Sequence, residues 1–192
     1  MPSLAATKAP VRNILRRFRR SRAGSAAVEF ALIAPVFFAL LFAIIEVATM
    51  FFASQVLETI TQDSARILMT GQAQTGGSCT DPASGSLAPC TPGTFHTYVC
   101  NQIPALFTCA NLYVDVESYS SFSNVIINSQ ITGGNFTSAN MQYQPGGPGD
   151  TVVVRMFYQW PLFVTGLGFN ISNLSGNKRL LVATAAFQNE PY

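Results

Sequence analysis

The sequence predicts an α+β protein in which a long N-terminal helix, including a transmembrane segment, packs on a small antiparallel sheet domain with a disulfide-stapled loop region. Three observations predict this class: an apolar N-terminal run, β-branched and aromatic segments late in the chain, and four cysteines between them. The chain has 192 residues, so the part beyond the helix corresponds to about one ordinary domain.

The apolar run covers about residues 28–53, and no charged residue lies between Phe30 and Ile45. A helix needs about 20 mainly apolar residues to cross a hydrocarbon core of about 30 Å. Since no other stretch of the sequence is long enough, we expect a single span.

Basic residues are concentrated before the span. Seven of the eleven Lys and Arg residues precede Ala23, and no acid lies among them: Lys8, Arg12, Arg16, Arg17, Arg19, Arg20 and Arg22. Basic residues flanking a span stay on the cytoplasmic side, so we expect a cytoplasmic N-terminus and an exported C-terminal part. A nucleic-acid-binding protein would carry its basic groups on the folded domain, so no nucleic-acid partner is expected.

All four cysteines follow the span: Cys79, Cys90, Cys100 and Cys109. An even number of cysteines in an oxidising compartment predicts disulfides, and four cysteines permit three connectivities. No C-x-x-C spacing is present and His96 is the single histidine, so neither a metal site nor a cofactor is expected.

Residues 25–70 are predicted to form one helix with a bend at Pro35, because proline removes a backbone hydrogen bond. Glu46 lies seventeen residues beyond Glu29, about 25 Å at 1.5 Å per residue, and is therefore expected at the outer membrane interface. Gly71 is expected to end the helix. Apolar residues at helical spacing predict a stripe that packs on the domain: Val56, Leu57, Ile60, Ile67 and Leu68.

Alternating apolar and polar residues predict a strand over residues 112–119, and a β-branched and aromatic run predicts the strongest strand over residues 151–160. Another strand is predicted over residues 180–188, and a second strand or lead-in over residues 122–127. Residues 95–107 are expected to hold a helical turn or two.

No catalytic motif is present, and we expect no enzymatic activity. Asp115 and Glu117 fall on the same face of a predicted strand, where a carboxylate pair is expected to be solvated.

The residues before the span do not form an ordinary secretory signal. Such a signal has an apolar core of about 7–15 residues and a small-x-small cleavage site behind it. Here the apolar run is longer. A basic leader is followed by Gly24 and Ser25; Glu29 lies four residues beyond Ser25, and Phe30 comes next. Taken alone, Glu29 is explained by interface placement and by the positive end of the helix dipole.

The pattern G-S-A-A-V-E-F-A-L-I-A-P resembles the N-terminus of type IV pilin-like proteins, most closely TadE-like pseudopilins of the Tad (tight adherence) pilus system. The segments Ser54–Arg66 and Ala183–Tyr192 are similar to other parts of TadE-like proteins, whereas the resemblance does not extend over about residues 71–150.

The resemblance implies that a prepilin peptidase of the bacterial inner membrane cuts between Gly24 and Ser25 and recognises Glu29 and Phe30. It also implies that Glu29 pairs with the new α-amino group of a neighbouring subunit, while Phe37, Phe38 and Leu41 pack the subunits together. Other pilin-like proteins and the Tad assembly platform are the implied partners.

The resemblance therefore predicts a minor pseudopilin for Tad/Flp-type pili in adherence, located in the inner membrane. The sequence leaves open whether it enters the pilus fibre or stays at its base. The expected parts are a cleaved leader over residues 1–24, the helix over residues 25–70 and a periplasmic domain over residues 71–192. The alternative is an uncleaved single-pass membrane protein whose periplasmic domain binds a ligand or partner. A pseudopilin role in type II secretion is a third hypothesis.

Overall fold

The computed structural model describes residues 24–165 and 170–192, so the basic leader lies outside the described residues, apart from Gly24. The chain divides into two compact units, Met1–Ile44 and Ile45–Tyr192. Helix α2 (Ser25–Met69) contributes residues to both units: its N-terminal part, residues 25–44, belongs to the first, and its domain part, residues 45–69, belongs to the second.

Helix α2 contains Pro35, and every buried residue of the helix lies at Glu46 or beyond. The predicted apolar stripe is present: Leu57 and Leu68 are fully buried, and Ile60 and Ile67 nearly so, with Val56 packed beside them. The helix ends as expected, because Gly71 adopts φ 73° and its N–H returns to the carbonyl of Leu68. A Cβ at Gly71 would lie 2.2 Å from the Tyr192 ring, so this position excludes side chains. The short helix α3 (Gln72–Thr75) follows.

Three long strands form the main sheet in the order β3 (Leu112–Tyr119), β6 (Thr151–Pro161) and β7 (Lys178–Gln188). Both pairings are antiparallel, as expected. The central strand β6 is buried on both faces over residues 151–158, which fits its β-branched and aromatic sequence. All three strands were predicted; β7 begins two residues earlier than expected, at Lys178.

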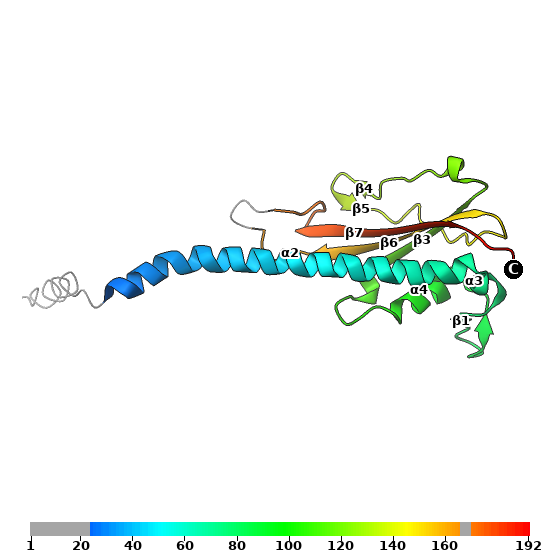
Figure 1. The fold of residues 1–192 in the computed structure, drawn as a ribbon, viewed down its shortest axis with the longest axis horizontal. Helices are drawn as coiled ribbons and strands as arrows, with labels where there is room; N and C mark the ends of the chain where they lie inside the picture. Colours follow the sequence, from blue (N-terminus) through cyan, green and yellow to red (C-terminus); the bar gives the residue numbers. More distant parts are fainter. Residues whose placement is uncertain (1–23, 166–169) are drawn as a thin grey trace, which may run out of the picture. The chain divides into compact units, whose positions relative to one another are not determined.

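The principal core lies between the sheet and the domain part of α2 (Figure 1). Alternate residues of β6 face this core, because side chains of a strand alternate between faces. The core residues from the three strands and α2 include Val116, Val152, Val154, Met156, Leu181, Ala183, Leu57 and Leu68.

The opposite face of the sheet is covered by the connection between β3 and β6. This connection contains β4 (Ile131–Thr132) and β5 (Asn135–Phe136), and a second cluster forms around Phe157, Leu174 and Leu180. Of the two possibilities expected over residues 122–127, the second strand is wrong. The 3-10 turn η3 (Phe122–Asn124) stands there, because the N–H groups of Asn124 and Val125 bond back to Ser121 and Phe122.

The turn-rich region is fastened by two disulfides, Cys79–Cys90 and Cys100–Cys109, with Cα–Cα distances of 5.2 and 5.6 Å. This is the sequential connectivity among the three left open by the sequence. Strand β1 (Cys79–Thr80), which pairs with β2 (Leu87–Ala88), carries Cys79, and the turn η2 (Cys109–Asn111) carries Cys109.

Helix α4 (Pro92–Cys100) starts earlier and ends earlier than the turns expected over residues 95–107. Its start is fixed by a capping box in which Thr91 and Thr94 exchange side-chain and backbone hydrogen bonds, with Pro92 in the first helical turn.

Candidate functional site

The predicted processing segment stands at the start of α2. Gly24 is exposed and has no atom within 4 Å of an ideal Cβ position, and the α-helix begins at the next residue, Ser25. The hydroxyl of Ser25 donates to Oε1 of Glu29 at 2.9 Å, one helical turn away. The peptide bond between Gly24 and Ser25 is thus accessible, and Glu29 is positioned one turn beyond it.

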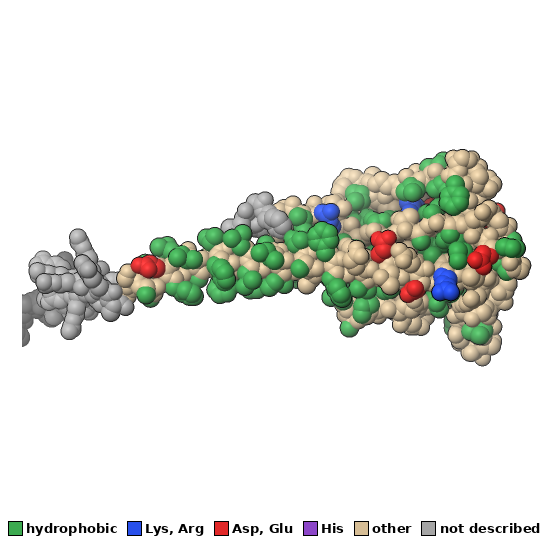
Figure 2. Space-filling view, viewed as in Figure 1, with side chains coloured by type: hydrophobic (Ala, Val, Ile, Leu, Met, Phe, Trp, Pro, Cys, Tyr) green, Lys and Arg blue, Asp and Glu red, His purple; other side chains and the backbone are tan. Residues whose placement is uncertain are grey.

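The predicted assembly residues follow on the N-terminal part of α2. Phe30, Phe37, Phe38 and Leu41 are exposed by 67%, 57%, 44% and 38%. Figure 2 shows hydrophobic side chains along this part of the helix. A helix that is apolar on all sides needs lipid or other helices around it. Among the described residues, α2 alone has the length and composition to cross a membrane.

The phenylalanines of this segment are arranged for packing. The ring centroids of Phe37 and Phe38 are 5.5 Å apart edge to face, and those of Phe38 and Phe42 are 6.4 Å apart and stacked. Such pairs present a rigid apolar surface with few rotatable bonds. The surface suits lateral contact with another apolar helix.

Glu46 is only 6% exposed, because a protein segment covers it. Its carboxylate accepts hydrogen bonds from the backbone N–H groups of Phe163 and Val164, the latter at 3.1 Å to each oxygen. The carboxylate therefore fastens the segment that follows β6 to α2. Sequence analysis missed this contact because the partners are more than a hundred residues away.

The expectation that Asp115 and Glu117 form a solvated pair is wrong. Asp115 is fully buried and Glu117 is 16% exposed, because the β3–β6 connection covers this face of the sheet. Both carboxylates bind the guanidinium of Arg155, which is the register partner of Asp115 on β6. The Arg155 Nη2 atom lies 2.5 Å from Asp115 Oδ2 and 3.0 Å from Glu117 Oε1.

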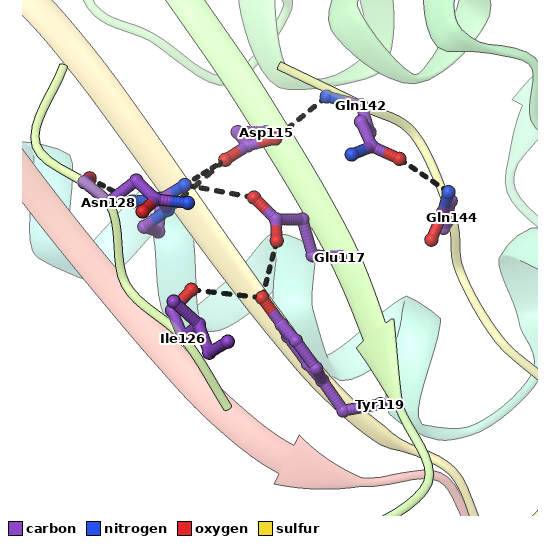
Figure 3. Close-up of polar contacts among 8 residues, drawn as sticks. Asp115, Glu117, Tyr119, Ile126, Asn128, Gln142 and Gln144 are labelled. Carbon is purple, nitrogen blue, oxygen red and sulfur yellow. Dashed lines mark hydrogen bonds and ion pairs between the residues drawn. The ribbon is translucent and has the colours of Figure 1, made fainter. Parts of the chain in front are cut away.

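Arg155, Asp115 and Tyr119 also bind the β3–β6 connection that covers this face of the sheet (Figure 3). Arg155 Nη1 donates to the Asn128 carbonyl at 2.9 Å, and the Gln142 N–H donates to Asp115 Oδ1 at 2.8 Å. Tyr119 donates to Glu117 and, at 3.0 Å, to the Ile126 carbonyl. All four charged and hydroxyl groups of this network are thus engaged in structural contacts.

Electrostatic effects in the network oppose one another. Burial raises the pKa of the Asp115 carboxyl, while the Gln142 N–H and the Arg155 guanidinium act to lower it. Burial and the hydrogen bond to Glu117 raise the pKa of the Tyr119 hydroxyl. The Asp115 carboxylate and the Tyr119 hydroxyl are both bonded to residues of the sheet or its covering connection, so we interpret the network as stabilising the fold.

His96, Cys100 and Cys109 bring their side-chain donor atoms within 4.8 Å of one another. The two sulfurs are joined in a disulfide, and a metal requires thiolates. The His96 ring nitrogen Nε2 lies 3.1 Å from the Leu112 carbonyl, which occupies that nitrogen. These residues therefore suit disulfide packing better than metal binding.

A groove of about 600 Å³ opens beside this histidine, between α4, β3 and the segment Ser138–Tyr143. Its lining has no Asp, Glu, Lys or Arg, and the Tyr143 hydroxyl is buried without a hydrogen-bond partner among the described residues. His96 and Ser138 both line the groove, but no hydrogen bond joins them among the described residues, and His96 Nε2 is paired with the Leu112 carbonyl.

Comparison with known protein families gives a match over one region of the chain. Residues 24–66 match the family model TadE, described as TadE-like protein. No curated protein and no solved structure matches the chain. The matched range starts at the predicted cleavage site and covers the N-terminal part of α2 and most of its domain part, which confirms the resemblance found in the sequence there.

Proposed function

We propose that this chain, TadE-like from residue 24 to residue 66, is a minor pseudopilin that takes part in the assembly of Tad-type pili for adherence. A TadE-like protein is associated with the Tad pilus, which is a structural and not an enzymatic role. The finer role is inferred from the segment around Gly24. An exposed glycine stands directly before a long apolar helix, with Glu29 one turn inside it.

In this proposal a prepilin peptidase removes residues 1–24 and leaves Ser25 as the new N-terminus. The helix over residues 25–70 anchors the chain in the inner membrane, and residues 71–192 form the periplasmic domain. Orientation follows from the basic leader, which stays cytoplasmic. The exposed Phe37, Phe38 and Leu41 then contact other pilin-like helices and the Tad assembly platform when the subunit leaves the bilayer.

The first experiment is the mass of the N-terminal peptide from cells with and without their prepilin peptidase. We expect a peptide that begins at Ser25 and is lost both without the peptidase and in the Gly24→Arg variant, because the enlarged side chain and added charge block the accessible peptide bond. Arg22→Lys is the matched control, since it keeps the leader charge and leaves the bond intact.

A peptide that still carries the leader in cells with the peptidase would overturn the proposal. The protein would then be a permanently anchored single-pass membrane protein, and its periplasmic domain would be tested for a ligand or partner.

A further inference from the structure

The segment after β6 holds an aromatic side chain outward. Phe163 is 84% exposed, the largest value for a large hydrophobic side chain among the described residues, and its neighbour Leu162 is buried. The described part of the connection after Pro161, residues 162–165, carries no charge. Exposure of this degree requires an explanation, because a phenylalanine in water loses the free energy that burial provides.

Phe163 is not at the tip of an unattached loop. The Glu46 carboxylate binds the N–H groups of Phe163 and Val164, and the Leu162 N–H donates to the Asn177 carbonyl at 2.9 Å. Three consecutive backbone N–H groups are therefore fixed, so the outward direction of Phe163 is built into the domain.

The level of Glu46 relative to a bilayer follows from the helix. Glu46 lies seventeen residues beyond Glu29, about 25 Å along the axis, against a hydrocarbon thickness of about 30 Å. With Glu29 at the cytoplasmic boundary, Glu46 lies near the periplasmic boundary. The backbone at Phe163, bound to Glu46, lies at the same level.

Other apolar side chains of the domain are exposed on the neighbouring turns of α2. Ile45 is 49% exposed, and Phe51 and Phe52 are 62% and 61% exposed. Aromatic side chains are enriched where membrane proteins meet the interface. Because these three residues of α2 lie at the end of the membrane-spanning segment, a lipid surface is the environment that would cover them. Water would leave Phe163 and the three side chains of α2 solvated.

We propose that residues 162–165 form a lipid-contact segment, which the Glu46 carboxylate fastens to α2 so that Phe163 inserts at the periplasmic face of the inner membrane. This proposal rests on the membrane anchoring in the proposed function, but not on cleavage. The segment holds the domain on the bilayer until the subunit is withdrawn, and withdrawal removes Phe163 from lipid.

The test uses nitroxide labels on single introduced cysteines in the full chain, reconstituted in phospholipid vesicles. Mass analysis first verifies that both native disulfides remain. Accessibility to oxygen, which partitions into lipid, is compared with accessibility to a water-soluble nickel chelate. We expect the oxygen-to-nickel ratio to be several-fold higher for Phe163→Cys than for Phe122→Cys.

Phe122 is a matched control, because it is also exposed, by 57%, and follows the end of β3 that pairs with Thr151, at the opposite end of β6 from Phe163. Glu46→Gln in the Phe163→Cys chain removes the charge that holds the two N–H groups, and should lower the ratio toward that of Phe122→Cys. An unchanged ratio would overturn the role given to Glu46.

Leu41→Cys reports on the span itself. If its label is in lipid while the Phe163 label is as water-accessible as the Phe122 label, the lipid-contact proposal is wrong and the proposed function stands. If the Leu41 label is also in water, the membrane anchoring shared by both proposals fails.

Discussion

The carboxylate of Glu29 has the Ser25 hydroxyl as its hydrogen-bond partner within the chain. In the proposed assembly Ser25 becomes an N-terminus and a neighbouring subunit brings its α-ammonium to Glu29 in an apolar bundle. Removing one member of a buried ion pair costs about 3–5 kcal/mol. Because the peptidase is also expected to recognise Glu29, the amount in the pilus is compared with the amount of cleaved chain. We expect Glu29→Gln to lower the share of cleaved chains that reaches the pilus at least tenfold, since about 1.4 kcal/mol is tenfold in an equilibrium constant.

Peptide masses and immunoblots of sheared pili measure the two effects separately. Glu58→Gln is the control, because Glu58 is exposed on the same helix beyond the apolar run. Equal amounts of both variants in the pilus fraction would contradict the role of Glu29.

The Asp115 carboxylate stabilises the fold within one chain, because it is buried beside Arg155 in the sheet. Asp115→Ala leaves the guanidinium without its main partner and should lower the free energy of unfolding by about 3–5 kcal/mol. Asp63→Ala removes an exposed carboxylate and should change it by less than about 0.5 kcal/mol. Urea unfolding of the full chain in detergent compares the two; similar midpoints would show that the network contributes little.

The two parts of helix α2 have different environments, because the domain part packs in the core and the side chains of the N-terminal part are mostly exposed. Leu57 is fully buried in the domain core, whereas Leu40 is 62% exposed in the N-terminal part. Leu57→Ala should lower the free energy of unfolding of the domain by about 2–5 kcal/mol, because it removes apolar contacts and leaves a cavity.

Leu40→Ala makes the same chemical change in the same helix and should leave the unfolding midpoint unaltered. Thermal unfolding of the two variants in detergent, followed by near-ultraviolet circular dichroism, distinguishes them. A comparable loss in the Leu40 variant would mean that the N-terminal part also supports the domain.

Over the whole molecule, two disulfides of similar span hold the turn-rich region. They join residues 11 and 9 positions apart, and each is expected to contribute about 3 kcal/mol in the chain-entropy model. Cys79 and Cys90 belong to the buried core, whereas Cys100 and Cys109 are half-buried.

Replacing Cys79 and Cys90 by serine should therefore destabilise the protein more than replacing Cys100 and Cys109, by about 1 kcal/mol or more, because serine hydroxyls would be buried in an apolar site. Chemical unfolding of the two double variants measures the difference, with the reduced wild type as the reference. Equal losses would assign the effect to chain entropy alone.

The local elements of this fold were predictable because their signals are local. Helical spacing identified the stripe from Leu57 to Leu68, alternation identified β3, and β-branched and aromatic residues identified β6. The start of α4 carried a usable signal as well, in the sequence Thr91-Pro92-Gly93-Thr94, which is typical of a helix N-terminus.

The polar contacts between distant segments were not predictable. Asp115 meets Arg155 only through the register of β3 on β6, and Glu46 meets Phe163 only once the sheet has packed on α2. A single sequence gives strand propensity but not register, and it does not show which face of β3 the following connection covers. Asp115 therefore had the pattern of a solvated residue.

The domain part of α2 runs beside β6 and β7, and the Glu190 N–H donates to the Met69 carbonyl at 2.9 Å, next to the end of the helix (Figure 1). Tension applied to the helix along its axis therefore reaches the domain as shear. In that geometry Met50, Leu57, Ile60 and Leu68 share the load, instead of detaching one after another. In the proposed assembly, a subunit pulled by its helix would thus leave the bilayer with its domain folded.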